Sequence, residues 1–447
     1  MGTLPFTYLG LPLHKSKPNV QDFWPIVSKC EKRLICTSQF LSLAGRLELV
    51  NSVFFALPTF CMCTFKLHKT IIEQIDKYRK HCLWRGSDIN AKNPPKAAWE
   101  MVCTSKQQGG LGILKIETQN IALLLKSLHK FYNRENLPWV ELVWEKYYSN
   151  GKLPGFSSKG SFWWRDLVKL INDFKGIASV QIKDGKTCLL WQDLWNGLVP
   201  MQSYPELFSF AKNRCISVQK TLSTDQIQSI FHLPLSEQAF AQMQELFSSL
   251  DSVQLVDEKD SWIYIWNSND YSSQKAYKQL SGSCYTHPIF SWTWKSFCQP
   301  KHKVFFWLLL KDRLSTRGLL RRRNMQLQDY NCVLCNEVLE ETREHLFLQC
   351  PYAQECWMRL GFRSERHNNL IRALCTCKAI MSLPFAFDII ILWSWSIWMA
   401  RNDLIFRNIQ PSVQRCIYRF KEDFSLVIRR SKRTIAPQMK TWIESFL

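Results

Sequence analysis

Acidic side chains are scarce in this sequence. Its 447 residues include 37 Asp and Glu against 58 Lys and Arg, which gives a net charge of +21. A surplus of this size favours a polyanionic partner such as RNA or DNA, and less so an anionic membrane surface, although a basic protein need not bind either. Disorder is disfavoured, because 46% of the residues are hydrophobic and 13% are aromatic, as in globular proteins.

Secretory and membrane signals are also lacking. The N-terminus, MGTLPFTYLGLPLHK, has no uninterrupted apolar run of the signal-peptide kind, and an odd count of seventeen cysteines does not suit a disulfide framework. The best membrane candidate, Phe385–Ala400, is shorter than the ~20 residues of a spanning helix and is interrupted by Asp388. We therefore expect an intracellular protein, nuclear or cytoplasmic, without a transmembrane helix or a membrane partner.

Familiar catalytic patterns are missing as well. The glycine cluster Gly109–Gly112 has neither the Walker lysine spacing nor a G-x-G-x-x-G pattern, so we interpret it as a turn. No set of carboxylates resembles a nuclease or ribonuclease H site, and the chain contains no Asp-Asp pair. These absences predict no catalytic residue and no small-molecule substrate.

A zinc-site pattern is present. Cys332, Cys335, His345 and Cys350 follow the spacing C-x2-C-x9-H-x4-C, in which two thiolates can converge from one tight turn and two further ligands return from a short helix. Four protein ligands fill a tetrahedral shell, so we predict one structural Zn²⁺ ion, whose binding contributes to folding. The alternative is four reduced, partly buried side chains; the substitute ligands would be Cys356, Cys375 and Cys377.

The remaining chain predicts a mainly α protein with small β-hairpin elements, of the α+β class. Apolar spacing predicts helices from Phe40 to Phe54, ended by Pro58, and over about Thr70–Trp84 and Thr118–Tyr132. We expect four segments: a helical region at 1–150, a β-containing connector with an acidic linker at 151–260, a zinc-binding helical module at 261–370, and a basic helical tail at 371–447.

The connector carries the strongest hairpin signal, Val180–Trp195, which alternates around Asp184-Gly185. Its tryptophans could stack on bases, but aromatic residues in and beside a hairpin are more often core. Residues 224–260 are rich in acids and are expected to form a solvated helix and linker. A short strand at Trp262–Trp266 and a helix beginning near Ser272 follow.

Basic residues precede the zinc pattern. Lys301–Asn324 is expected to form an apolar helix, a Ser-Thr-Arg-Gly break and a second helix that ends in three arginines. Simple solvation would explain these cations, but their position beside a zinc module predicts contact with nucleic acid. The candidate residues are Lys301, Lys303, Arg313, Arg317, Arg321, Arg322 and Arg323. A second basic run, Arg429–Arg433, could be a nuclear localisation signal, a phosphate-contacting patch or merely exposed.

Several stretches, in this order, resemble the C-terminal part of a plant LINE-type (non-LTR) retrotransposon reverse transcriptase, ending in its reverse-transcriptase zinc-binding domain. The resemblance implies that the N-terminal helices are similar to a polymerase thumb and the region after it, and it strengthens the zinc assignment. The stretches are YLGLPL (Tyr8–Leu13), LSLAGRLELVNSV (Leu41–Val53), LWRGS (Leu83–Ser87), AAWEMVCTSKQQGGLGI (Ala97–Ile113), SFWWRDL (Ser161–Leu167), DGKTCLLWQDLW (Asp184–Trp195) and the segment Trp292–Met325 with the Cys/His set.

The sequence differs from this family in the segment that carries the catalytic residues. Members that polymerise carry, before YLGLPL, a palm with a Tyr/Phe-Ala-Asp-Asp turn that supplies carboxylates to two metal ions. This sequence has no such turn, and Met1 falls after the expected end of the palm. The resemblance therefore implies an RNA-directed DNA polymerase family, whereas the chain itself is expected to be non-catalytic.

Four functional hypotheses follow. The first is a non-catalytic, zinc-containing module that binds RNA or DNA. The second is a protein-interaction module that docks onto a separate reverse-transcriptase polypeptide. The third is that the reading frame is a truncated form of an active RNA-directed DNA polymerase gene. The fourth is an unselected relic without function.

Overall fold

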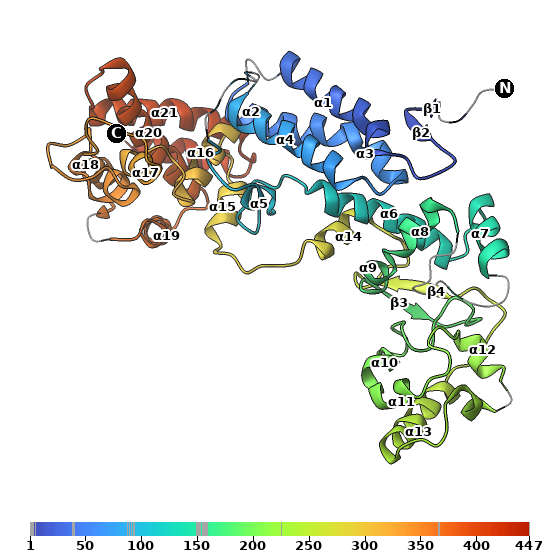
Figure 1. Ribbon diagram of the computed structural model, residues 1–447. Helices are drawn as coiled ribbons and strands as arrows, with labels where there is room; N and C mark the ends of the chain where they lie inside the picture. The colour runs from blue at the N-terminus through green and yellow to red at the C-terminus, as the bar shows by residue number, and fades with distance from the viewer. Residues whose placement is uncertain are drawn as a thin grey trace. The chain divides into compact units, whose positions relative to one another are not determined.

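The computed structural model describes residues 4, 6–37, 41–86, 88, 90, 92, 94–148, 153, 160–224, 226–364 and 367–446 (Figure 1). The chain forms two compact units, each built from three separate stretches. Unit 1 consists of Met1–Lys29, Phe55–Ile75 and Lys115–Ser283, and unit 2 consists of Cys30–Phe54, Asp76–Leu114 and Cys284–Leu447. The four-segment division expected from the sequence stays a prediction.

Unit 1 contains both of the small sheets found among the described residues. Each sheet is a pair of antiparallel strands, β1 (Phe6–Tyr8) with β2 (Leu11–Leu13) and β3 (Ala178–Gln181) with β4 (Ser261–Tyr264). Its helices are η1 (Val20–Phe23), α3 (Phe55–Thr64), α6 (Ile116–Tyr132), α7 (Pro138–Tyr148), α8 (Phe162–Val168), α9 (Ile171–Lys175), α10 (Pro200–Ser203), α11 (Pro205–Ser209), α12 (Val218–Leu222), η3 (Ile227–Ile230), α13 (Glu237–Asp251) and α14 (Ser273–Leu280).

Unit 2 is helical. Two further helices, α1 (Trp24–Thr37) and α4 (Lys69–Arg85), contribute residues to both units. The helices of unit 2 are α2 (Leu43–Leu49), η2 (Val50–Phe54), α5 (Trp99–Cys103), α15 (Ile289–Lys295), α16 (Pro300–Leu310), α17 (Arg317–Arg322), η4 (His345–Gln349), α18 (Pro351–Arg359), α19 (Leu370–Met381), α20 (Ala386–Arg407), α21 (Val413–Arg430) and α22 (Ala436–Ser445). The predicted fold class, mainly α with small β elements, is confirmed.

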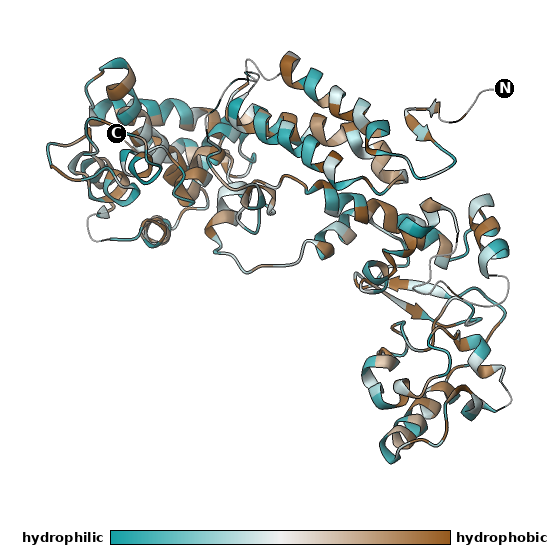
Figure 2. Cartoon of the chain, viewed as in Figure 1, coloured by the Kyte–Doolittle hydropathy of each residue, from teal (hydrophilic) through white to brown (hydrophobic). Residues whose placement is uncertain are grey.

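Helices with a regular apolar stripe were predictable. The stretches Thr70–Trp84 and Thr118–Tyr132 correspond to α4 and α6, and the helix expected near Ser272 is α14, whose first turn Ser272 caps by accepting a hydrogen bond from the Lys275 N–H. Along α4, hydrophobic and hydrophilic residues alternate (Figure 2), and Ile71 and Ile75 on the apolar side are fully buried. Burial of such a stripe is what stabilises a helix of this length in water.

Pro58 does not end its helix, contrary to the prediction. It lies inside α3, which continues to Thr64. The preceding turn, Val50–Phe54, is π-helical and therefore wider than an α-helical turn. A proline ring is excluded from an α-helix mainly by the carbonyl four residues earlier, here that of Phe54. The widened turn ends at that residue, which accounts for the tolerance. The predicted start of this helix, Phe40, lies outside the described residues.

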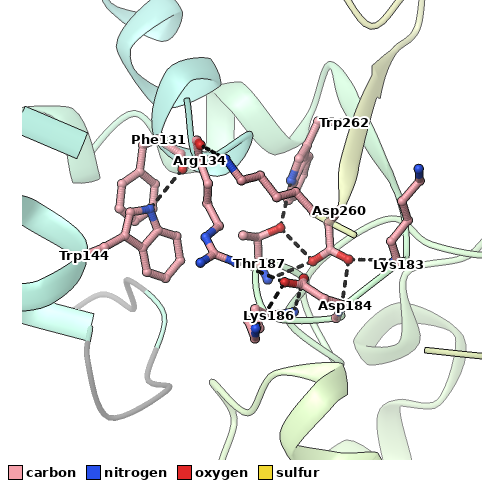
Figure 3. Close-up of polar contacts among 11 residues, drawn as sticks. Phe131, Arg134, Trp144, Lys183, Asp184, Lys186, Thr187, Asp260 and Trp262 are labelled. Atoms are coloured by element: carbon pink, nitrogen blue, oxygen red, sulfur yellow. Dashed lines mark hydrogen bonds and ion pairs between the residues drawn. The ribbon is translucent and has the colours of Figure 1, made fainter. Parts of the chain in front are cut away.

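The hairpin predicted around Asp184-Gly185 is wrong in its pairing. β3 pairs instead with β4, in the register Val180↔Trp262, more than eighty residues away. The loop after β3 wraps around one carboxylate: Asp260 accepts hydrogen bonds from the N–H groups of Lys183, Gly185 and Thr187 and from the Thr187 hydroxyl, all at 2.8 Å (Figure 3). A long-range carboxylate thus fixes a loop whose composition is typical of a local turn.

Asp260 also corrects the expectation of a solvated acidic stretch. It is only 2% exposed, and Asp184 in the same loop is 7% exposed and pairs with Arg134 at 3.0 Å (Figure 3). The aromatic residues around the loop belong to the core of unit 1, as expected, since Trp164, Trp191 and Trp195 are almost completely buried. These tryptophans are therefore not available to stack on bases.

Helix α20 is a core helix, as predicted for Phe385–Ala400. Nearly all of its first twelve residues are buried, and Asp388, which interrupts the apolar run, accepts a hydrogen bond from the Phe297 N–H at 2.6 Å. One helical run, Leu43–Thr64, is long and apolar enough to span a membrane by length and composition alone, a test that core helices of soluble proteins also pass. The polar residues Arg46, Glu48 and Asn51 lie within that run.

Candidate metal centre

The two N-terminal candidate ligands lie on a short loop closed by backbone hydrogen bonds. The Cys332 N–H donates to the Leu339 carbonyl at 2.9 Å, and the Glu341 N–H donates to the Tyr330 carbonyl at 2.9 Å. Together with the bridge between Asn331 and Glu340, these bonds bring the ends of the loop together. Cys335 lies inside the loop, one turn from Cys332, as the C-x2-C spacing predicts.

The two C-terminal candidate ligands lie at the ends of η4. His345 begins this helix and Cys350 follows it directly, at the N-cap position of α18. Because η4 is π-helical, the Cys350 N–H donates to the His345 carbonyl, five residues back, at 2.7 Å. The wide turn places both side chains on the side of the Cys332–Cys335 loop.

The four ligand atoms converge. The sulfur atoms of Cys332, Cys335 and Cys350 and a ring nitrogen of His345 all lie within 4.8 Å of one another. The Cys332 and Cys350 sulfurs are 3.9 Å apart, and the Cys335 sulfur is 3.4 Å from His345 Nε2. Ligands held about 2.3 Å (S) and 2.0 Å (N) from a tetrahedral zinc ion would be separated by roughly 3.5–3.8 Å. The donor set and its spacing fit one structural zinc ion with Nε2 as the histidine ligand.

The surroundings of the Cys350 sulfur favour a thiolate, whereas those of Cys332 and Cys335 favour the thiol. Backbone N–H groups of Tyr352 and Ala353, in the first turn of α18, point at the Cys350 sulfur. The Cys332 thiol donates to the same sulfur, which lowers the pKa of Cys350 to about 4 and raises the pKa of Cys332. Burial raises the pKa of Cys335. Thiolates are the form that binds zinc, and amide donors stabilise them.

One buried polar atom of the site lacks a protein partner. His345 is 2% exposed, and its Nδ1 has no hydrogen-bond acceptor among the described residues. The main chain at His345 is held by the bond that its N–H donates to the Thr342 hydroxyl at 3.1 Å. The substitute ligands are not needed: Cys356 lies beside Cys416 and Tyr352, and Cys377 is buried in α19.

A buried ion pair attaches the zinc loop to the core helix. Glu341, directly after the loop, is fully buried and accepts hydrogen bonds from Arg401 of α20 at 2.8 and 3.2 Å. The same carboxylate accepts the Arg317 N–H at the start of α17 at 2.9 Å. Glu341 therefore links three elements, and sequence reasoning did not identify it.

Six of the seven basic residues expected to contact nucleic acid have a carboxylate or carbonyl partner within unit 2. Lys303 donates to the Trp294 carbonyl, Arg317 pairs with Asp329 at 3.2 Å, and Arg322 pairs with Asp312 at 2.6 Å. Lys301 and Arg321 make longer ion pairs with Asp423 and Glu340, both at 3.7 Å, Arg313 is half-buried, and Arg323 donates to the Lys96 carbonyl at 2.8 Å. Most of these cations hold unit 2 together in addition to any role at its surface.

The comparisons with known proteins agree with the site. Residues 271–357 match the family described as zinc-binding in reverse transcriptase. This reverse-transcriptase zinc-binding domain contains all four ligands and lies within the segment 261–370 that the sequence suggested.

Two plant proteins are similar over longer stretches. A putative ribonuclease H protein of Arabidopsis thaliana is 24% identical over 424 residues, which covers 88% of this chain and 66% of that protein, so the chain spans just under two thirds of this relative. An uncharacterized mitochondrial protein of the same plant is 25% identical over 146 residues, 31% of this chain and 92% of that protein.

Proposed function

We propose that this chain is a non-catalytic, zinc-containing module that binds RNA or DNA and derives from a plant LINE-type reverse transcriptase. The observation that carries the proposal is the distribution of charge. Unit 2, which holds the zinc site, has 35 basic and 18 acidic residues, a net charge of +17, whereas unit 1 has 23 and 19, a net charge of +4. A strong local surplus of positive charge is the electrostatic signature of nucleic-acid binding.

The role proposed for zinc is structural. Four protein ligands leave no position for a water molecule or a substrate, so the ion would hold the Cys332–Cys335 loop against α18 and not take part in chemistry. In the described part of the chain, Cys332, Cys335, His345 and Cys350 are the one group of three or more His, Cys, Asp or Glu ligand atoms that converges. Phosphoryl transfer by two metal ions requires a set of convergent carboxylates. Since the described residues contain no such set, this requirement supports a non-catalytic role.

A binding titration tests the proposal. Purified protein with about one zinc ion per chain is mixed with labelled 20-nucleotide RNA or DNA at several salt concentrations. We expect the affinity to fall steeply with salt, because each cation that contacts a phosphate releases counterions. Absent binding, or binding that ignores salt, would contradict the proposal.

The finer family assignment, to LINE-type elements, has its own test. It rests on the colinear stretches from Tyr8 to Met325. Genomic DNA on the 5′ side of the Met1 codon would carry an in-frame Tyr/Phe-Ala-Asp-Asp motif if the reading frame belongs to a longer polymerase. Stop codons in that frame would argue instead for an independent, non-catalytic product. The relative's name, putative ribonuclease H protein, suggests a nuclease, and incubation of a labelled RNA–DNA hybrid with the protein and Mg²⁺ would reveal cleavage of the RNA strand.

A second function, docking onto a reverse-transcriptase polypeptide, is favoured by one observation. Val338 and Leu339, at the C-terminal end of the zinc loop, are 83% and 51% exposed. Two adjacent exposed apolar residues favour contact with another protein. Co-purification of such a polypeptide after nuclease treatment, and its loss in Val338→Asp, would support docking; recovery that depends on nucleic acid would refute it.

A further inference from the structure

Unit 2 contains an open cleft of about 850 Å³ beside the zinc loop. Its walls are α17 with the loop that follows, Gln326–Asp329, and the last two turns of α20, and Lys96 lies on its rim. The volume lies in the upper part of the ~300–1,000 Å³ range of pockets that hold drug-sized ligands, and is large enough for a nucleotide whose neighbours extend into solvent.

The cleft combines aromatic surface with amide groups. Phe406 is 76% exposed, and Trp398 is half-buried. The guanidinium of Arg401 lies 4.9 Å from the centre of the Trp398 ring. Gln326, Gln328 and Asn402 supply side-chain amides, which can both donate and accept hydrogen bonds. Exposed aromatic rings beside amides are typical of surfaces that stack and bind unpaired bases.

The rim carries positive charge that acids do not fully balance. Asp329 is the one acidic residue that lines the cleft, and it is paired with Arg317. Burial, and after it the charges of Arg46 and Arg323, lower the pKa of Lys96. Burial and the charges of Arg313 and Arg322 likewise lower the pKa of Arg323.

These like charges repel one another. Lys96 lines the cleft, whereas Arg46, Arg313, Arg322 and Arg323 belong to its charged neighbourhood without lining the cleft. The Nε atoms of Arg46 and Arg313 are buried without a hydrogen-bond acceptor among the described residues. Clustered cations of this kind cost folding free energy, which a bound anion would offset. Phosphate groups are anions of suitable charge and geometry for lysine and arginine.

From this arrangement we infer that the cleft binds single-stranded nucleic acid, with phosphates at Lys96 and unpaired bases against the exposed ring of Phe406. The inference rests on the proposed function and assigns it a site. A duplex would offer its phosphates to the rim, but its bases are stacked inside the helix and could not reach aromatic rings within a cleft.

The zinc loop shapes this cleft. Phe347, two residues after the ligand His345, stacks on Trp398 with ring centres 6.5 Å apart and an angle of 19° between the rings. Arg401 is fixed by Glu341, which directly follows the zinc loop. The metal would therefore help to position the α20 wall of the binding site without contacting the nucleic acid.

The test compares cleft variants with matched controls in the full chain. Phe406→Ala removes the exposed ring and Lys96→Ala removes the rim charge. Tyr418→Ala removes a ring that is 65% exposed on α21, outside the cleft, and Lys69→Ala removes a well-exposed lysine of unit 1. The probes are labelled oligo(U) and oligo(dT) of 12 nucleotides, with heparin as a polyanion that has no bases.

We expect Phe406→Ala to weaken oligonucleotide binding roughly 10-fold without changing heparin binding, because stacking requires bases. Lys96→Ala should weaken both, and should reduce the slope of log K against log salt by about 1. The two controls should stay within about twofold of wild type. Photocrosslinking should yield adducts on the peptide that contains Phe406.

The outcomes separate the two proposals. If the wild type binds oligonucleotides but the cleft variants behave like the controls, the site is wrong and the proposed function stands. If heparin binds as tightly as oligonucleotides and Phe406→Ala changes neither, stacking is excluded and the inference fails. If no oligonucleotide binds, both are refuted. Phe406 is exposed, and unchanged circular dichroism and zinc content would verify that its variant is folded.

Discussion

At the scale of single residues, the four zinc ligands allow the sharpest prediction. Cys335→Ser or His345→Ala leaves three ligands, so zinc should bind much more weakly, and part of the ~10–16 kcal/mol that structural zinc contributes to folding should be lost. We expect zinc content, measured by mass spectrometry, to fall well below one ion per chain and the melting temperature of unit 2 to drop. Cys284→Ser, at an exposed cysteine of the same unit, is the control. Unchanged zinc content and melting temperature in both ligand variants would refute the assignment.

Asp388 predicts an unusual dependence of stability on pH. Burial raises the pKa of this carboxyl to about 6, despite the hydrogen bond from the Phe297 N–H and the charge of Lys303 nearby. The folded chain thus holds the proton more tightly than the unfolded chain. The resulting stabilisation is complete below pH ~4 and is lost as the pH rises through ~6, an effect of about 3 kcal/mol.

The variant Asp388→Asn isolates this effect, because its amide oxygen can still accept from Phe297 but carries no charge. We expect the variant to be more stable than wild type at pH 7.5 and of similar stability at pH 4, as measured by urea unfolding. Zinc release at acidic pH affects both proteins equally and cancels in the difference. A difference that does not vary with pH would exclude a buried, titrating carboxyl.

Residues whose role depends on near neighbours in the sequence could be predicted. The zinc ligands are an example, because a tight turn and a short helix place all four within nineteen residues. Asp260 and Glu341 could not be predicted, since Asp260 accepts from the Lys183 N–H 77 residues away and Glu341 pairs with Arg401 60 residues away. The cleft residues Lys96 and Phe406 were missed for the same reason, although an exposed phenylalanine in the charged end of α20 was a signal.

At the scale of elements, the Glu341–Arg401 pair connects the zinc loop to α20. Removing either partner alone, as Glu341→Gln or Arg401→Met, leaves a buried charge without compensation and should destabilise unit 2 by about 3–5 kcal/mol. The double variant should lose less than the sum of the two. The measurement is a double-mutant cycle by urea unfolding. Additive losses would mean that the two side chains do not interact.

In unit 1, the loop after β3 depends on Asp260. Asp260→Asn replaces an acceptor of four hydrogen bonds with a side chain that also donates, so some of the N–H groups of Lys183, Gly185 and Thr187 lose their partner. We expect a loss of about 2–4 kcal/mol and hydrogen exchange at these amides at least tenfold faster. Asp257→Asn, at a neighbouring exposed residue, should leave their exchange unchanged. Slow exchange in Asp260→Asn would contradict this role.

Elements were predictable where their own sequence determines them. The stripes of α4 and α6 specified these helices almost to the residue. The predictions for Pro58 and for the Asp184-Gly185 turn were wrong. A π-helical turn lets the helix continue through Pro58. The pairing of β3 with β4 replaces the local hairpin expected at Asp184-Gly185. Neither tertiary influence is visible in a local sequence window.

At the scale of the whole molecule, the two units have separate cores. The hydrophobic core that includes Trp164, Trp191 and Trp262 lies entirely within unit 1, and the zinc site lies in unit 2. Chelation of zinc should therefore increase hydrogen exchange in α16, α18 and α20 and leave β3, β4 and α6 protected. Hydrogen-exchange mass spectrometry with and without chelator measures this. Equal loss of protection in both units would show that they unfold as one.

The chain passes several times between the two units, which affects how the protein folds during its synthesis on the ribosome. Helix α2 packs against α16 in unit 2, and about 250 residues separate them in the chain. At a translation rate of ~5–20 residues per second, tens of seconds pass between the synthesis of α2 and the emergence of α16, which covers its apolar side. During that interval Ala44 and Leu47 of α2, which are buried in the finished protein, are exposed. The nascent chain should therefore be a client of chaperones until translation has passed the zinc loop.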